Sequence, residues 1–179
     1  NTYGVCGPVI ANVSGGPYVE KVSFGNIAGA SAINYIRVNG NGATVQFTNT
    51  TTDRQLLTFS GTKYVTIDSL TFKSLATDFG WGALITNAAE HDSLINCFFD
   101  LTSVTNISSA NTNGITFSGS STTATTVGTN GSNCYIGNNY IKFTDGTGGG
   151  YYALVVSGPN DNNVIENNTF ENFYYYGAY

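Results

Sequence analysis

The segment Leu56–Leu75 reads LLTFSGTKYVTIDSLTFKSL, and three later segments repeat its plan almost residue for residue. They are Ala83–Leu101 (ALITNAAEHDSLINCFFDL), Gly114–Thr144 and Ala153–Phe173 (ALVVSGPNDNNVIENNTFENF). Each begins with a short apolar strand that closes on small residues, passes through a polar turn and enters a second strand. Repeats of this length that contain strands, without helical periodicity, are typical of a solenoid whose coils stack on one another.

Apolar anchor residues align the four repeats. The first strand is centred on Leu57, Leu84, Ile115 and Leu154 in turn, and the second strand on Ile67, Ile95, Ile136 and Ile165. The two anchors of a repeat lie 10 or 11 residues apart, except in the third repeat, where they lie 21 residues apart. The excess falls in residues 120–132 (SSTTATTVGTNGS), which lack apolar periodicity. We therefore predict a loop insertion at 120–132.

The second strand of each repeat must bend. Large apolar residues are five positions apart in Ile67 and Phe72, Ile136 and Ile141, and Ile165 and Phe170, but four apart in Ile95 and Phe99. An odd spacing in a flat strand would put two side chains on opposite faces, so a bend must return both to the interior. Asn138–Asn139 and Asn167–Asn168 stand at this bend, where their side chains are placed to form a stacked amide ladder. These features predict an all-β parallel β-helix of about six to seven coils.

The composition excludes several classes of protein. Only 9% of the residues are charged, and the net charge is −5 with six Lys and Arg. Nucleic-acid binding needs clustered cations, so no nucleic-acid partner is expected. No stretch approaches the roughly 18 apolar residues of a membrane span. The three cysteines match no metal-binding spacing, so neither a metal nor a cofactor is predicted.

The chain is predicted to form a single domain over residues 1–179. Its last residues are aromatic and show none of the polar caps that usually protect the ends of solenoids. We therefore expect a segment of a longer chain, or a chain whose open ends are covered by head-to-tail copies.

Several motifs in the first half resemble a known family. They are GPVIANVSGGPYVEKVSFGNIAGAS (7–31), GNGATVQF (40–47), TKYVTIDSLTF (62–72) and GWGALITN (80–87). Their order resembles the right-handed parallel β-helix repeat proteins of Bacteroidetes cell surfaces, many of which are exported by type IX secretion. The resemblance implies right-handed coils, a pectate-lyase-like fold and an extracellular or cell-surface location.

Two outward columns of the predicted coils carry most of the charges. One contains Asp68, Asn96, Gly137 and Glu166, and the other contains Lys73, Asp100, Lys142 and Glu171. Asp68 and Glu166 would be three coils, or about 14 Å, apart, which is too far for the paired carboxylates of a glycoside hydrolase. The second column alternates in sign, which predicts a ladder of weak surface ion pairs.

Glu90, His91 and Asp92 form the densest cluster of titratable residues, on the turn between the two strands of the second repeat. A histidine between carboxylates can serve as a general base or a metal ligand, so these three are the candidate catalytic residues. The equivalent positions, Lys63 and Asn160–Asp161, add no supporting groups. The sequence therefore favours an exposed turn without a catalytic role, and Glu90, His91 and Asp92 are only weak catalytic candidates.

Aromatic residues provide a candidate ligand-binding surface, and two short motifs suggest modification. Consecutive aromatic residues in a strand cannot all face inward, so some must be exposed or covered by a partner. The candidate binding residues are Trp81, Tyr151, Tyr152, Tyr174, Tyr175 and Tyr176; Tyr179 belongs to the same run. Ser69 and Ser93 lie in Asp-Ser-Leu tripeptides that match an O-glycosylation motif of Bacteroidetes.

We expect a non-enzymatic structural or adhesive segment of a large cell-surface or filament-forming protein. Its partners would be further coils of the same chain or head-to-tail copies of itself, with polysaccharide as a further candidate ligand. The alternative is a carbohydrate-active β-helix, either a polysaccharide lyase or glycoside hydrolase or a carbohydrate-binding module, because parallel β-helices are the scaffold of such enzymes.

Overall fold

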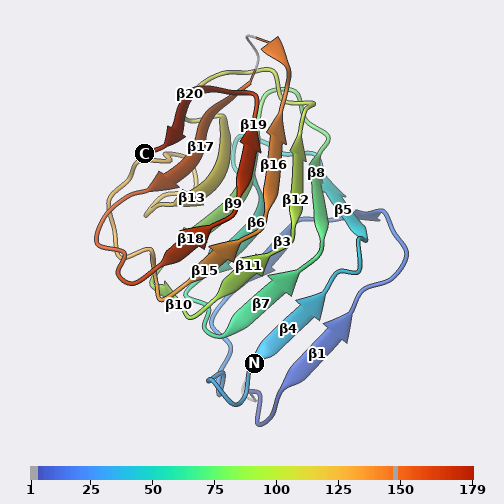
Figure 1. The fold of residues 1–179 in the computed structure, drawn as a ribbon, viewed down its shortest axis with the longest axis vertical. Helices are drawn as coiled ribbons and strands as arrows, with labels where there is room; N and C mark the ends of the chain where they lie inside the picture. Colours follow the sequence, from blue (N-terminus) through green and yellow to red (C-terminus); the bar gives the residue numbers. More distant parts are fainter. Residues whose placement is uncertain (1–3, 147–148) are drawn as a thin grey trace.

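The computed structural model describes residues 4–146 and 149–179, which fold into three parallel sheets of six strands each (Figure 1). Sheet A consists of β1 (Val9–Asn12), β4 (Ile36–Asn39), β7 (Val65–Asp68), β11 (Ser93–Ile95), β15 (Tyr135–Gly137) and β18 (Val164–Glu166). Sheet B consists of β2 (Tyr18–Val19), β5 (Thr44–Phe47), β8 (Thr71–Ser74), β12 (Phe98–Leu101), β16 (Tyr140–Phe143) and β19 (Thr169–Glu171). Sheet C consists of β3 (Val22–Phe24), β6 (Gln55–Ser60), β9 (Gly80–Thr86), β13 (Thr112–Phe117), β17 (Gly150–Val156) and β20 (Phe173–Ala178).

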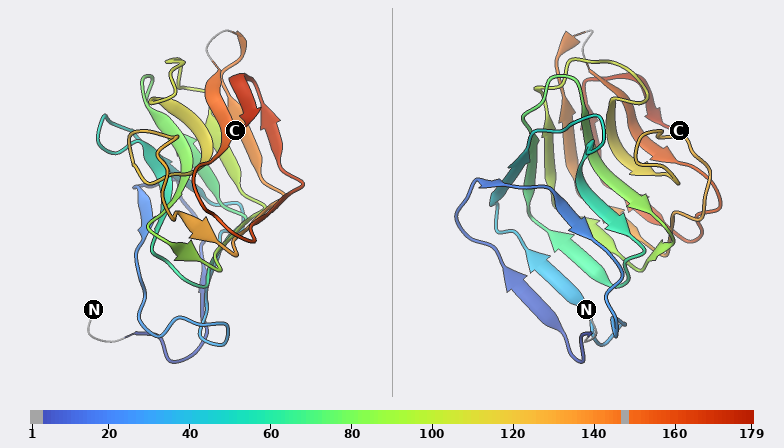
Figure 2. Two further views of the ribbon diagram at one scale, coloured as in Figure 1. Left: turned by 90° about the vertical axis from the view of Figure 1, so that its left-hand side faces the viewer. Right: turned by 180° about the vertical axis from the view of Figure 1, so that it is seen from behind.

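Every third strand pairs in parallel with the strand one coil earlier, so the chain winds through sheets A, B and C six times. The result is a right-handed parallel β-helix of six coils, which confirms the predicted fold class. Figure 2 shows the stack from the side, with the first coil at one end and the last at the other. A short extra pair, β10 (Ala89–Glu90) and β14 (Gly131–Ser132), links the fourth and fifth coils. No helix in residues 4–146 and 149–179 has the length and apolar character needed to cross a membrane.

The interior is built from columns of stacked apolar side chains. The column through sheet B contains Tyr18, Val45, Phe72, Phe99, Ile141 and Phe170. The spacing predicted that Phe72, Phe99, Ile141 and Phe170 return to the interior in successive coils, and the pairing confirms it. The rings of Phe72 and Phe99 lie 5.0 Å apart and nearly parallel, and both side chains are fully buried. Such stacking lets each coil bury the apolar face of the next.

The predicted alignment was wrong by one residue in one repeat. Leu94, not Ile95, pairs with Ile67 and Ile136 in the inward column of sheet A. From Leu94 to Phe99 the spacing is again five, so the apparent irregularity of this repeat disappears. Ile95 instead faces outward beside Asp68, in the place predicted for Asn96. A shift of one residue moves a side chain to the other face of a sheet, which is why the choice of anchor matters.

The same slip occurred in the first strand of that repeat. Ala83, not Leu84, pairs with Leu57 and Ile115 in the inward column of sheet C. Leu84 pairs with Thr58 and Thr116, and it belongs to a second apolar cluster outside the main core. An apolar residue on the outer face was mistaken for an anchor because that face is covered by another part of the chain.

The corner between sheets A and B uses a left-handed backbone residue in each coil. Ser69, Asn96, Asn138 and Asn167 occupy this position with φ between 54° and 57°, a conformation that Asn tolerates better than most residues. The next residue points inward. In the last two coils this residue is Asn139 and Asn168, and Asn139 donates to the side-chain oxygen of Asn168 at 2.9 Å. The predicted amide ladder is therefore present.

The inserted loop folds back on the outer face of sheet C. The predicted insertion, residues 120–132, makes up most of the segment that follows β13. Its last two residues, 131–132, form the short strand β14. Its Ala124 is buried with the outward side chains of Trp81, Leu84, Tyr152 and Val155. Gln55 and Arg54 donate to the carbonyl oxygens of Ser121 and Thr122. The insertion thus covers part of sheet C with a small core of its own.

Candidate functional site

The turn Glu90–His91–Asp92 divides between the inside and the outside of the coil. Asp92 points into the interior, level with Val65 of the neighbouring coil, and is only 2% exposed. Its carboxylate accepts hydrogen bonds from the Val65 amide, at 2.8 Å, and from the Thr62 hydroxyl. Burial raises the pKa of Asp92 to about 6, because the charged form loses its hydration. Asp92 therefore holds the corner of the neighbouring coil.

Glu90 and His91 face outward. Glu90 forms an ion pair with Lys63 at 2.8 Å, and this hydrogen bond lowers the pKa of Glu90. The His91 ring stacks on Tyr64 with 4.7 Å between ring centres, and its Nε2 lies 3.6 Å from Glu90 Oε1. The three candidate catalytic residues thus contact different partners, and Asp92 faces away from the space that Glu90 and His91 share.

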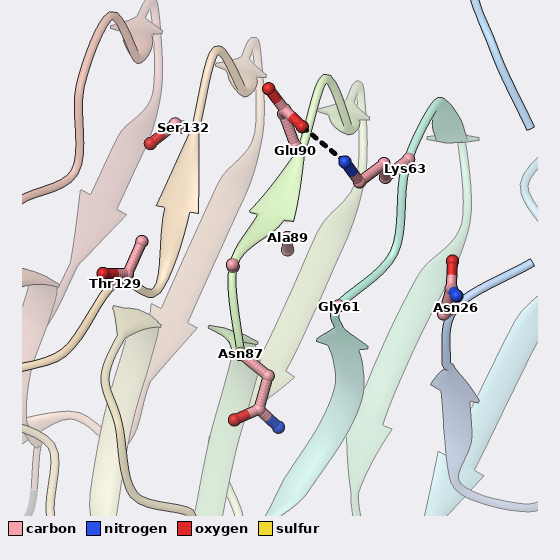
Figure 3. Close-up of a pocket in the computed structure, with 9 residues that line it drawn as sticks. Asn26, Gly61, Lys63, Asn87, Ala89, Glu90, Thr129 and Ser132 are labelled. Atoms are coloured by element: carbon pink, nitrogen blue, oxygen red, sulfur yellow. Dashed lines mark hydrogen bonds and ion pairs between the residues drawn. The ribbon is translucent and has the colours of Figure 1, made fainter.

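An open groove of about 510 Å³ lies along this corner of the coils. It is lined by Asn26, Gly61, Lys63, Asn87, Ala88, Ala89, Glu90, Thr129 and Ser132. Figure 3 shows that Lys63 and Glu90 point toward one another and neutralise each other in the ion pair. The remaining lining is small or neutral, so the groove offers hydrogen-bonding groups and no concentrated charge.

The outward columns of sheet B carry the predicted ion pairs. Lys73 lies 3.3 Å from Asp100, and Lys142 lies 3.0 Å from Glu171. Asp68, on sheet A, is paired with Arg37. Each of these carboxylates has a cation or amide partner in the neighbouring coil, as expected of a ladder that runs along the stack.

The tyrosines gather at the end of sheet C. We call Tyr151, Tyr152, Tyr174, Tyr175, Tyr176 and Tyr179 the tyrosine patch. Tyr151 and Tyr152 belong to β17, and the next three belong to the adjacent strand β20. Tyr175 contacts the rings of Tyr151, Tyr174 and Tyr176, with the ring centres 5.0, 6.5 and 4.3 Å apart. Tyr174, Tyr175, Tyr176 and Tyr179 are exposed.

Trp81 does not belong to this surface. Its side chain is fully buried, and its indole N–H donates to the carbonyl oxygen of Ala110 at 3.0 Å. The prediction that Trp81 contributes to an exposed binding surface was therefore wrong. The side chain does face outward from β9, but the inserted loop and the segment around Ala110 cover it, and neither covering segment could be placed from the repeat pattern.

The two candidate glycosylation sites lie on or beside sheet A. Ser69 stands at the corner, half-buried, and its hydroxyl donates to Asp68 Oδ1 at 2.8 Å. Ser93 begins β11 and pairs with Thr66 and Tyr135 in an outward column.

Cys97 and Cys134 are buried free thiols in two different corners, and burial raises the pKa of each to about 12.

The sequence analysis missed a second groove, on the outer face of sheet C. We call it the hydroxyl groove. It has a volume of about 360 Å³, and its lining is Lys21, Ser23, Thr52, Gln55, Thr58, Ser60, Leu84, Thr86, Asn87, Gly119 and Ser121. Hydroxyl and amide groups dominate this lining, and Lys21 is paired with Asp53 at 2.7 Å.

One buried hydroxyl in the lining of the hydroxyl groove has no hydrogen-bond partner. The hydroxyl of Thr58 is buried and makes no hydrogen bond, although Asn87 donates to the neighbouring Ser60 hydroxyl at 2.8 Å. An unpaired buried hydroxyl is unfavourable unless a further molecule satisfies it. The alternation of Thr58 and Ser60 with inward Leu57 and Phe59 was a usable signal for an outward polar row. The sequence did not show that three coils and two loops would combine into one groove.

Within residues 4–146 and 149–179, no group of three or more His, Cys, Asp and Glu side chains is arranged to hold a metal ion. Comparisons of the chain with protein-family models, with curated proteins and with solved structures gave no match.

Proposed function

We propose that the chain is a non-enzymatic structural or adhesive β-helix segment of an extracellular, cell-surface protein, and that it associates end to end through its first and last coils. Its motif order, which resembles the Bacteroidetes surface proteins, supports this location. The observation that supports the association is the exposure of the apolar columns at the two ends of the stack. They run through all six coils, and they are buried in the middle but partly open at both end faces.

One outward column gives the proposed contact a register. Its members are Ile10, Arg37, Thr66, Ser93, Tyr135 and Val164. The four inner members carry polar groups, whereas Ile10 and Val164 are apolar and 54% and 46% exposed. If the last coil of one copy pairs with the first coil of the next in the same register, Ile10 and Val164 become neighbours and cover each other.

The first coil also has an apolar hollow that an incoming coil would close. The hollow has a volume of about 230 Å³ and is lined mainly by Val13, Tyr18, Val22, Phe24, Val38, Val45, Ile67 and Leu70. Tyr18 heads the inward column that ends in Phe170, so the same register would bring Phe170 of the next copy against Tyr18. Unpaired strand edges with apolar side chains favour this kind of pairing.

Light scattering after size-exclusion chromatography, with electron microscopy, tests the proposal. We expect concentration-dependent oligomers that extend in one direction, because a head-to-tail contact does not close. Ile10→Lys and Val164→Lys should each weaken association at least about tenfold, since they place an unpaired charge in the contact. A protein that stays monomeric at high concentration with both end coils ordered would overturn the proposal.

Two further variants separate the contact from general effects. Val127→Lys changes a 72% exposed apolar residue on the inserted loop, away from both end faces, and should leave association unchanged. Combining Ile10→Lys and Val164→Glu in one chain should restore association, because every head-to-tail contact then has opposite charges on its two sides. If all three lysine variants behaved alike, the register derived from this column would be wrong.

The hydroxyl groove favours a second function, the binding of a neutral saccharide. Its lining of hydroxyl and amide groups, with the unpaired Thr58 hydroxyl, fits a ligand that has many hydroxyls and no charge. Binding would be measured by NMR shifts with oligosaccharides from xylan. Thr58→Val should remove binding, whereas Thr66→Val, on the outer face of sheet A, should not. Chemical-shift changes confined to residues outside the hydroxyl groove, or no changes at all, would reject this function.

A further inference from the structure

The tyrosine patch brings phenol rings from two neighbouring strands into contact. Tyr151 of β17 and Tyr175 of β20 lie with 5.0 Å between ring centres and 29° between ring planes. Tyr175 is exposed, whereas Tyr151 is half-buried behind it. The pair therefore combines access from solvent with a preset neighbour across the strands.

We propose that the tyrosine patch is a site of oxidative phenol coupling, in which a peroxidase-type oxidant joins Tyr151 to Tyr175. Each phenol would lose one electron and one proton to the oxidant and become a phenoxyl radical. The two radicals then form a carbon–carbon bond between the ring carbons next to the oxygens. The hydrogen on each bonded carbon returns to the phenol oxygen, so two phenols and one hydrogen peroxide give one dityrosine and two waters.

The surroundings of the pair favour coupling within one molecule. Tyr175 also contacts Tyr174 and Tyr176, so a radical formed on any of these exposed rings can pass to Tyr175 by oxidising its neighbour. The parallel pairing of β17 with β20 holds the two rings together before oxidation. Bond formation then needs only a small approach of two groups that are already oriented.

The bond would fasten the outermost strand of sheet C to the coil beneath it. β20 pairs with β17 and carries the exposed residues Phe173 and Tyr174. A strand at the edge of a sheet opens more readily than one inside the stack. A covalent link from Tyr175 to Tyr151 would keep β20 in place even when its hydrogen bonds open.

The test is oxidation of the dilute, purified protein with hydrogen peroxide and a haem peroxidase, followed by mass spectrometry. Cleavage after Lys142, Glu166 and Glu171 separates Tyr151, in residues 143–166, from Tyr175, in residues 172–179. We expect these two peptides to be recovered as one species that has lost two hydrogen atoms, together with dityrosine fluorescence from monomeric protein.

Variants assign the coupled residues. Tyr175→Phe keeps the ring and removes the phenol, and should reduce the yield of the joined peptides at least about fivefold. Tyr35→Phe, at an exposed tyrosine outside the patch, should leave the yield unchanged. The proposal is overturned if fragmentation places the bond between Tyr175 and Tyr176, if coupling occurs only between molecules, or if Tyr175→Phe has no effect. Neither fluorescence nor mapping depends on whether the protein associates end to end.

Discussion

The third coil and the first coil have the same strand order but very different surroundings. In the third coil, Val65 and Phe72 are fully buried, whereas Val9 and Tyr18, which occupy the same columns of the first coil, are exposed. Both coils contain apolar residues at the inward positions, so the difference arises from neighbours and not from composition. A coil of this β-helix is stable because coils above and below it bury its side chains.

The largest effect should come from removing a ring in the middle of the stack. Phe99→Ala should lower the free energy of unfolding by about 3–5 kcal/mol, because it leaves a cavity between Phe72 and Ile141. Tyr18→Ala, in the same column of the first coil, should cost less than about 1 kcal/mol in the monomer. Urea unfolding of the two variants measures the contrast, and equal losses would refute the dependence on neighbours.

Asp92 should make the middle of the stack sensitive to pH. Its pKa of about 6 lies above the ordinary value of 3.8, so its stabilising contribution is complete below about pH 4 and is lost as the pH rises through 6. A shift of about two units corresponds to about 3 kcal/mol. The free energy of unfolding of the wild-type protein, measured relative to that of Asp92→Asn, should therefore increase as the pH is lowered from 7 to 4. A stability difference that does not change with pH would contradict a raised pKa.

The amide ladder offers an intermediate effect. Asn139 accepts a hydrogen bond from the Cys97 amide and donates to the carbonyl oxygen of Leu94, both inside the stack. Asn139→Ala leaves these groups unpaired and should cost about 1–3 kcal/mol. Asn168→Ala, one coil closer to the end, should cost less because water can reach the groups it leaves. Thermal unfolding of the two variants and of the wild-type protein measures both losses of stability and shows which is larger.

The smallest effect should come from the ion-pair ladder. Lys73→Gln removes the partner of Asp100 at the surface of the middle coils and should change stability by no more than about 1 kcal/mol. The difference should shrink further in about 1 M salt, where the charges are screened. A loss comparable with that of Asn139→Ala would mean that surface charge, and not burial, distinguishes the coils.

The sequence predicted those features that repeat from coil to coil. The inward column from Phe72 to Phe170, the amide corner and the insertion all followed from spacing, because each coil has to present the same pattern to the next. The slip at Ile95 shows the limit of this reasoning. Two adjacent apolar residues, Leu94 and Ile95, are equally good anchors in the sequence, and only the pairing decides between them.

The candidate sites were harder to predict because they depend on segments outside the repeat. Trp81 faces outward from its strand, but the inserted loop covers it. A loop without apolar periodicity cannot be placed from the spacing of the repeats. The hydroxyl groove draws Ser23, Thr58 and Ser121 from different coils and loops. Asp92 looked like part of a catalytic turn because its neighbours Glu90 and His91 are charged or titratable, yet the backbone directs it inward.

Hydrogen exchange measured residue by residue tests the central claim most directly. In dilute protein, the amides of β7, β11 and β15 should exchange only through global unfolding, whereas those of β1 and β18 should exchange through local opening. On raising the concentration, β1 and β18 should gain protection together, because each would become an inner strand of a longer stack. Equal protection of all six coils in dilute protein, or end coils that stay unprotected while the protein associates, would contradict the account.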